Sequence, residues 1–429
     1  MLHHERSIYS GDGWTVATRA LRDRGLRPIR TDETNPFARY TVHTRLAGVL
    51  EDLLEDDAGL PDPHVDAVRR LKEDLDEDRP IEMFAPPAPD WEWWRDRFEA
   101  HAARMAEISE RPPSPLNAEW FFYEHFFYRK LAEATDWWGS GIDPFAAAKR
   151  RELESESLWR SVGRTLADVW HAASDIDPLA ELIAFELWGN RADLSYGAVA
   201  ELGHDEVDES ALIANDLHEA RRYLEDAAGD GPVHIVTDNA GTELSADLAL
   251  SDYLIESKGL SVYLHPKYHP TYVSDTTPPD IHELVAQMRR ATLGPAPQLV
   301  REVGERLAGH ISEGLLRIAP DQFWNGPDFY DLLPERLARP FSRASLVIVK
   351  GDMNYRRVLF DLAPDPWTPM AEVSASVSAP TLLVRTMKGD SIAGLSREMT
   401  EHLEAEDERW RVNGKRGVVQ LLFPGRHGT

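Results

Sequence analysis

The feature that most constrains the fold is an alternation of short β-rich runs with helical segments after about residue 230. The apolar runs VHIV, LSVYLHP, SLVIVK and TLLVRT are separated by segments with helical spacing, such as TELSADLALSDYLIESK, DIHELVAQMRRA and YRRVLFDLA. Parallel strands need a crossover connection, usually a helix, so this order predicts a doubly wound, mainly parallel sheet with helices on both faces. The segment RWRVNGKRGVVQLLF predicts an Asn413-Gly414 hairpin that adds a last strand.

The first part of the chain has a different pattern. Apolar residues recur at helical spacing in RYTVHTRLAGVLEDLLEDD and HVDAVRRLKEDLDEDR, and the segment NAEWFFYEHFFYRKLAEATDWW is dense in aromatic residues. The aromatic segment suits a buried helix that anchors a helical region better than a ligand cage. Another apolar helix, DPLAELIAFELW, is expected to stop at Gly189-Asn190. We predict an all-helical N-terminal domain over residues 1–200 and a three-layer α/β/α domain over residues 201–429.

Composition excludes several classes of function. The formal charge of −27 repels nucleic acid and anionic membranes, so neither is expected as a partner. The chain has no Cys, so any metal must be held by oxygen or imidazole. No run approaches the ~20 apolar residues of a membrane span, and the start MLHHERSIYSGDGW lacks the pattern of a secretory signal. We expect a cytoplasmic protein, and the sequence leaves its oligomeric state open.

Polar residues gather where the predicted strands end. Ligands of open α/β sheets bind beyond the carboxyl ends of the strands, so these residues are candidates for a site. The residues that follow the runs are Asp238 and Asn239; Ser274 and Asp275; Lys350, Asp352 and Asn354; and Arg385, Thr386 and Lys388. Carboxylate and amide oxygens beside cations suit a hard divalent cation together with a phosphorylated ligand.

Each candidate also has a simpler explanation. Asp238 or Asn239 can cap the helix that follows, and Asp275 can belong to an ordinary turn. Asp352 or Asn354 can cap a helix in the same way, and Lys388 can be a solvated surface residue. The joint pattern at successive strand ends is what favours a site.

Several blocks of the sequence resemble the damage-control phosphatase family, long catalogued as domain of unknown function 89. In chain order they are TDNAGTELSADLALSDYLI, YVSDTT, FWNGPDFYDLLPE, KGDMNYRRVLFDL and RTMK. The tetrapeptide RTMK is similar to the R-T-x-K signature of the third subfamily, the acidic-residue methyltransferase-like and sugar phosphate phosphatase branch. EWFFYEHFFYRKL, ELWGNRADLS and RWRVNGKRGVVQLLF also resemble that branch, so the likeness runs from roughly residue 115 to the C-terminus.

The resemblance implies a helical region packed on an α/β/α domain, with a divalent metal, often Mn²⁺, Ni²⁺ or Co²⁺, with Mg²⁺ also possible. It implies hydrolysis of phosphate monoesters of small sugar phosphates, such as fructose 1-phosphate, in metabolite damage control. Matched to the family motifs, the metal ligands are Asp238, Asn239 and Asp275. The substrate-binding positions are Glu243, Gly351, Asp352, Met353, Asn354, Tyr355, Arg385 and Lys388. Of these, Lys388 is expected to stabilise phosphoryl charge, and Asp352 to orient the nucleophile or protonate the leaving alkoxide.

Two other functions stay open. Relatives in the third subfamily have been described as S-adenosylmethionine-dependent protein-glutamate methyltransferases, but TDNAGT lacks the Gly-rich turn usual for that cofactor. A non-catalytic sugar-phosphate binder is the third candidate, which the complete set of metal and lysine positions disfavours. Whether water or an Asp attacks phosphorus is also open, and we favour water activated by the metal.

Overall fold

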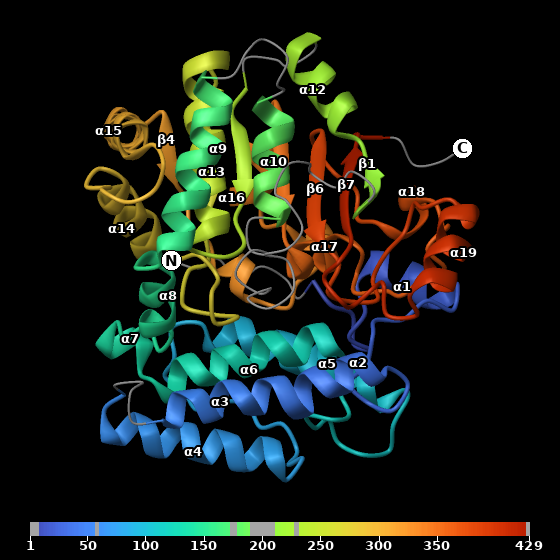
Figure 1. The fold of residues 1–429 in the computed structure, drawn as a ribbon. Helices are drawn as coiled ribbons and strands as arrows, with labels where there is room; N and C mark the ends of the chain where they lie inside the picture. The colour runs from blue at the N-terminus through green and yellow to red at the C-terminus, as the bar shows by residue number, and fades with distance from the viewer. Residues whose placement is uncertain (1–7, 56–59, 172–177, 189–210, 227–230, 426–429) are drawn as a thin grey trace.

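The computed structural model describes residues 8–55, 60–171, 178–188, 211–226 and 231–425. These residues form a seven-stranded sheet with helices on both faces and a further group of helices beneath it (Figure 1). The predicted α/β class is confirmed. The predicted helix stop at Gly189-Asn190 lies outside the described residues. Within the described ranges, no helix is both long and apolar enough to cross a membrane.

The strands follow one another in a mixed but largely parallel order. In chain order they are β1 (Leu212–Asn215), β2 (Val233–Val236), β3 (Val262–His265), β4 (Leu316–Ile318), β5 (Leu346–Lys350), β6 (Thr381–Thr386) and β7 (Gly417–Leu422). Across the sheet the order is β1-β7-β6-β5-β2-β3-β4, and only the β6–β7 pair is antiparallel. The four predicted runs form β2, β3, β5 and β6. Their continuous apolar character fits strands buried on both faces.

The two faces of the sheet are covered by separate hydrophobic cores. In β5, Leu346 and Ile348 belong to one core, and Val347 and Val349 belong to the other. This alternation is expected because successive side chains of a strand point to opposite faces. The sheet is therefore the middle of three layers.

The helices of the layers next to the sheet come mainly from the second half of the chain. They are α8 (Ala146–Leu153), α9 (Glu156–His171), α10 (Pro178–Trp188), α12 (Leu217–Asp226), α13 (Thr242–Lys258), α14 (Pro278–Met288), α15 (Pro297–Glu313), α16 (Glu335–Phe341), α17 (Asp352–Val358), α18 (Met370–Val373) and α19 (Arg397–Glu406). Two 3-10 turns, η4 (Gln322–Asn325) and η5 (Tyr330–Leu332), precede α16. Helix α13 has the bounds of the predicted segment TELSADLALSDYLIESK.

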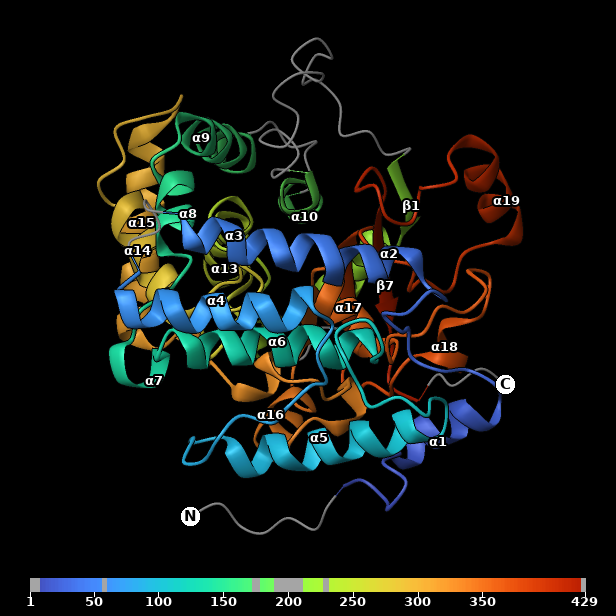
Figure 2. The same cartoon turned by 90° about the horizontal axis from the view of Figure 1, so that it is seen from below.

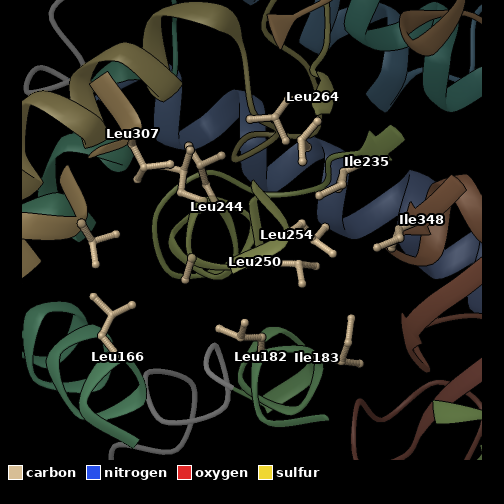
Figure 3. Close-up of a cluster of buried hydrophobic side chains, with 14 of the residues drawn as sticks. Leu166, Leu182, Ile183, Ile235, Leu244, Leu250, Leu254, Leu264, Leu307 and Ile348 are labelled. Carbon is tan, nitrogen blue, oxygen red and sulfur yellow. The ribbon is translucent and has the colours of Figure 1, made fainter. Parts of the chain in front are cut away.

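Helix α13 lies at the centre of the larger core. Its Leu244 and Leu254 lie among Leu182 of α10, Leu307 of α15 and Ile235 of β2 (Figure 3). Because neighbours surround α13, its polar side chains are buried as well, and a buried carboxylate needs a partner. Helices α9 and α10 belong to this same core, and the predicted division of the chain at residue 200 stays a prediction.

The remaining helices form the group beneath the sheet. They are α1 (Val16–Asp23), α2 (Pro36–Tyr40), the π-helix η1 (Thr41–Leu46), α3 (Ala47–Leu54), α4 (Asp62–Asp76), α5 (Trp91–Ala106), α6 (Trp120–Ala134) and α7 (Trp137–Ser140). Seen from below, α3, α4 and α6 lie side by side across the molecule (Figure 2). Helix α6 is buried along most of its length, as predicted for the aromatic segment.

A buried polar network joins this group to the segment that follows β5. Arg356 of α17 donates to Glu124 of α6 (2.9 Å) and to Asp361 (2.7 Å). Its neighbour Arg357 contacts His125 of α6 (3.0 Å). Both arginines are almost completely buried, so the ion pairs and hydrogen bonds offset the cost of removing their charge from water. The helical group is thereby fixed to the edge of the sheet where β5 ends.

The predicted Asn413-Gly414 hairpin is wrong, although the last strand is present. The antiparallel partner of β7 is β6, which ends at Thr386, and α19 lies between the two strands in the chain; the other neighbour of β7 is β1. The segment before β7 forms turns because Trp410 is buried in the core on that face of the sheet. Gly414 has a φ of 73° and donates its N–H to Met387 O (2.9 Å).

Candidate active site

The ends of β2 and β3 are joined by backbone hydrogen bonds. An isolated antiparallel bridge pairs Asn239 with Asp275. Ala240 N donates to Ser274 O (2.7 Å), and Thr276 N donates to Asp238 O (2.8 Å). The three predicted metal ligands therefore lie on neighbouring stretches of backbone, although they are far apart in the sequence.

Neither Asp238 nor Asn239 is needed to cap α13. The N-cap residue is Gly241, which has a φ of 69° and no side-chain cap hydrogen bond. Glu152 of α8 instead accepts from Thr242 N (2.8 Å) and Thr242 Oγ1 (2.9 Å). The helix-cap explanation is wrong for these two residues.

The simpler explanation for Asp275 was an ordinary turn, and its backbone pairs with Asn239 in the isolated bridge. The N-cap of α14 is Thr277, which forms a capping box with Asp280. The buried Asp275 Oδ2 makes no hydrogen bond within the described part of the chain, and its ion-pair partner is Lys267 Nζ at 3.3 Å. Burial raises the pKa of Asp275 to about 6, against the opposing effect of Lys267.

Asp238 is surrounded by charges of both signs. Burial raises its pKa well above the ordinary range, and the Glu243 and Asp275 carboxylates raise it further, whereas Lys388 and Lys267 lower it. Carboxylates held together in this way repel one another when ionised. A cation bound between them would remove that repulsion.

Asn239 completes the group of oxygen and nitrogen atoms around Asp238. Its Nδ2 donates to Asp238 Oδ2 (3.1 Å) and to Glu243 Oε1 (3.0 Å), and its Oδ1 accepts from Ser274 Oγ (2.5 Å). Ligation of a metal beside Asp238 through the amide oxygen would therefore require the amide to rotate. In the described ranges, no three His, Cys, Asp or Glu side chains form a ready-made metal site. A cation here would depend on the Asn239 amide, and on water or a ligand oxygen, as hard cations allow.

The end of β5 packs directly against Asp238. Gly351 has a φ of 86°, and a Cβ at this position would overlap the Asp238 carboxylate. Only glycine accommodates both the positive φ and this close approach. Asp352 follows as the first residue of α17, so the N-cap is Gly351 rather than Asp352.

The Asp352 carboxylate is paired with Arg385 of β6. Oδ1 lies 2.9 Å from Arg385 Nε and 2.7 Å from Arg385 Nη2, and it also accepts from Lys388 N at 3.2 Å. Burial alone would raise the pKa of Asp352, but Arg385 and Arg356 outweigh burial and lower it. Asp352 is therefore ionised at neutral pH.

Arg385 is fully buried and holds the segment after β6 in place. Its Nη2 donates to Gly389 O (2.7 Å), Nη1 donates to Ser391 O, and the guanidinium lies 4.6 Å from the ring centroid of Tyr355. Arg385 thus connects Asp352 to the backbone beyond the R-T-x-K tetrapeptide.

A cavity of about 40 Å³ lies where these strand ends meet. The predicted site residues that line it are Asp238, Glu243, Gly351, Asp352, Arg385 and Lys388, and its other lining residues are Glu186, Leu187, Lys350, Val384 and Thr386. One water needs roughly 10–15 Å³ by this kind of measure, so the cavity has the size of a phosphoryl group or a hydrated ion rather than a whole sugar phosphate. Lys388 is half-buried at its wall instead of lying on open surface.

Other predicted residues lie outside the cavity lining. Asn239 and Asp275 pair with each other in the bridge between the segments that follow β2 and β3, and neither of them lines the cavity. The remaining three, from α17, are buried. Met353 Sδ accepts from Tyr272 Oη (3.5 Å), Asn354 Nδ2 donates to Lys350 O (2.9 Å), and Tyr355 Oη donates to Gln420 Oε1 (2.7 Å). These three side chains face the protein interior, and their assignment to substrate binding stays a prediction.

Glu186 and Asp247 were not among the predicted site residues, although both pair with Lys350 at the candidate site. They lie on α10 and α13, away from the strand ends that guided the prediction. Lys350, which was identified as a strand-end cation, is 2.5 Å from Glu186 Oε1 and 2.7 Å from Asp247 Oδ1. A signal was available, because Glu186 and Asp247 lie between apolar residues of helices rich in Leu and Ala, and a buried carboxylate needs a partner.

The fold and the cavity define a doubly wound α/β protein with a small, charged ligand site at the carboxyl ends of its strands. Residues 41–403 match the family model of the damage-control phosphatase ARMT1-like domain. The chain belongs to this family, so the resemblance seen in the sequence is confirmed.

The relatives and the structural neighbour cover most of the chain. Damage-control phosphatase ARMT1 of Danio rerio is 27% identical over 395 residues, covering 83% of this chain and 85% of the relative. The protein of the same name from Homo sapiens is 24% identical over 419 residues, covering 90% and 92%. A DUF89 family protein of Pyrococcus horikoshii, solved by crystallography, is 16% identical with a TM-score of 0.46, covering 90% of this chain and 98% of that chain.

Proposed function

We propose that this protein is a divalent-metal-dependent phosphatase that hydrolyses phosphate monoesters of small sugar phosphates, as part of metabolite damage control. Membership of a damage-control phosphatase family supports a hydrolase whose substrate is a small metabolite. The observation that carries the proposal is the cavity in which Asp238, Asp352 and Lys388 meet at the ends of three strands. Phosphate is bound by such combinations of cations and metal-held carboxylates.

The residues present fit a divalent cation. Asp238, Asn239 and Asp275 would hold it. Burial, followed by repulsion from Glu243 and Asp275, raises the pKa of Asp238, and a bound cation would relieve that repulsion, which supports this assignment. Oxygen donors suit Mn²⁺ or Mg²⁺, and Ni²⁺ or Co²⁺ are compatible with them. When bound, the metal supplies neutralisation of phosphate charge and a lower pKa for its water.

The chain's own residues would orient and stabilise the reacting groups. The Lys388 ammonium would stabilise charge on the phosphoryl oxygens during transfer. Asp352, ionised and held by Arg385, can accept a hydrogen bond from the attacking water and so orient it. An ionised carboxylate is a poor proton donor, so we do not assign Asp352 the protonation of the leaving alkoxide.

A phosphate-release screen tests the function directly. Metal-stripped protein should release no phosphate from a panel of sugar phosphates that includes fructose 1-phosphate. Adding Mn²⁺, Ni²⁺, Co²⁺ or Mg²⁺ singly should restore turnover, because the metal neutralises charge that the carboxylates alone would repel. The readout is inorganic phosphate over time. Equal turnover in the presence of excess chelator would contradict the metal requirement.

Methyl transfer from S-adenosylmethionine is not expected under conditions that give measurable phosphatase turnover. The turn after β2 carries Gly241 against the Glu152 carboxylate, and it has no second glycine to admit a cofactor. Calorimetry should detect no binding of S-adenosylmethionine. Tight binding at one molecule per chain would favour the methyltransferase instead.

A further inference from the structure

Three buried ionisable groups meet at the cavity. Lys350 Nζ lies 2.5 Å from Glu186 Oε1 and 2.7 Å from Asp247 Oδ1. Glu186 is 4% exposed, Lys350 2% and Asp247 0%, so solvent does little to screen the three charges. Glu186 and Lys350 also line the cavity, together with Asp238, Asp352 and Lys388.

The cluster has one more carboxyl group than it has cations. Glu186 Oε2 and Asp247 Oδ2 are buried and have no hydrogen-bond partner that donates to them in the described part of the chain. Lys350 donates its hydrogen bond to Asp247 Oδ1 (2.7 Å), whereas neither Glu186 oxygen accepts one within the described residues. A buried carboxylate without a hydrogen-bond donor or a counter-ion of its own favours the neutral, protonated form.

That proton belongs on Glu186. Burial raises the pKa of Glu186 well above its ordinary range, Lys350 opposes this, and the nearby Asp247 adds to it. Burial opposes the charge on Lys350, but Asp247, which accepts a hydrogen bond from its Nζ (2.7 Å), raises the pKa of Lys350, so the lysine stays charged. Glu186 is then a neutral carboxylic acid at neutral pH, next to a cavity of phosphoryl size.

Sugar phosphates need a proton donor that the residues discussed so far do not supply. An aliphatic alkoxide is a poor leaving group unless it is protonated as it departs. Asp352 is ionised and engaged by Arg385, and Lys388 is assigned to the phosphoryl oxygens. We propose that Glu186 is the general acid that protonates the leaving oxygen of an aliphatic phosphate ester; this inference rests on the proposed phosphatase function.

In the proposed hydrolysis, Glu186 gives its proton to the leaving sugar oxygen. The oxygen of a water molecule forms a bond to phosphorus, and the bond between phosphorus and the sugar oxygen breaks. The sugar oxygen keeps the bonding electron pair and takes the proton of Glu186, which gives the free sugar. The attacking water loses one proton, which returns through solvent to Glu186, and inorganic phosphate leaves. Lys350 stabilises the Glu186 carboxylate while it is ionised.

The test compares two esters with different leaving groups. On the best sugar phosphate of the panel, Glu186→Gln should lower kcat/KM about 10²–10⁴-fold, the usual contribution of a general acid. On 4-nitrophenyl phosphate it should change kcat/KM little, because nitrophenolate leaves without a proton. Gln matches the neutral form of Glu186 in size and charge, so the variant should fold and keep its metal by elemental analysis.

Two further variants control for structural effects. Asp252→Asn removes another fully buried carboxylate of α13, one that pairs with Arg306 (2.6 Å) and does not line the cavity, and it should leave the ratio of the two activities unchanged. Glu186→Asp keeps an acid but shortens it, and it should retain part of the activity on the sugar ester. An equal loss on both esters in Glu186→Gln would overturn the proposal. If the wild-type protein turned over neither of the two esters, the phosphatase function itself would be overturned, and the role of Glu186 as a general acid with it.

Discussion

Replacing Asp238 with alanine is expected to abolish metal-dependent phosphate release while leaving the fold intact. Asp238 contributes a carboxylate to the candidate metal site. Burial and the neighbouring Glu243 and Asp275 raise its pKa, so we expect the ionised carboxylate to cost the metal-free protein stability. The metal-free variant should therefore be at least as stable to heat as the metal-free wild type. Turnover, elemental analysis and thermal unfolding check the three expectations.

The effect of added metal on Tm separates loss of binding from other defects. A ligand present at about 100 times its Kd stabilises the native state by about 2.7 kcal/mol, so the wild-type Tm should rise on addition of Mn²⁺. Asp238→Ala should show no such rise. Full metal occupancy in this variant would remove Asp238 from the site.

Asp275 requires a more conservative change. Its carboxylate is the ion-pair partner of the buried Lys267, and removing one partner of a buried pair typically costs about 3–5 kcal/mol. Asp275→Ala would thus confuse lost metal binding with lost stability. Asp275→Asn keeps the shape of the side chain and is the better companion to Asp238→Ala.

Lys388→Ala is expected to reduce kcat roughly 10²–10³-fold, the typical cost of losing one preorganised charge at a transition state. Metal content should be unchanged, because the side chain is not among the candidate ligands. The hydrogen bond from Lys388 N to Asp352 comes from the backbone and survives the substitution. Lys388→Arg should recover only part of the activity, since a planar guanidinium does not replace a compact ammonium in a small cavity. Steady-state kinetics with metal content measured in parallel gives the readout.

A lysine far from the cavity provides the matched control. Lys72 lies on α4 and pairs with Asp76 (2.7 Å). Lys72→Ala removes the same charge from the chain and should leave kcat unchanged. Turnover near the wild-type value in Lys388→Ala would exclude this lysine from the mechanism.

The sequence predicted the parts of the fold that local patterns determine. The bounds of α13 match the predicted segment, and β2, β5 and β6 contain continuous apolar runs. Strands β1 (LIAN) and β4 (LRI) were missed because they are the edge strands of the sheet, are only partly buried and are not continuous apolar runs. The hairpin was mispredicted because a turn signal does not reveal that Trp410 belongs to the core.

The candidate site was predicted to a similar extent and for a similar reason. The rule that ligands bind at the carboxyl ends of parallel strands placed Asp238, Asp352 and Lys388 at one edge, and they line one cavity. The same rule cannot find Glu186, which comes from a helix in the first half of the chain. Tyr355 was assigned to the substrate by its match to a family motif. Its side chain is buried and donates to Gln420 Oε1, and its assignment stays a prediction.

The position of α13 has a consequence for protein engineering. Residues of α9 and α10, such as Leu166 and Leu182, pack in the same core as α13. Helix α13 also carries Asp247, which pairs with Lys350 of the cavity lining. A cut at residue 200 would separate Glu186 from Lys350 and expose the leucines that α13 buries. Residues 201–429 are therefore not expected to work as an independent fragment. The first part of the chain supplies helices that cover the core of the sheet domain, and it supplies Glu186 at the cavity, so an engineered fusion must contain both parts.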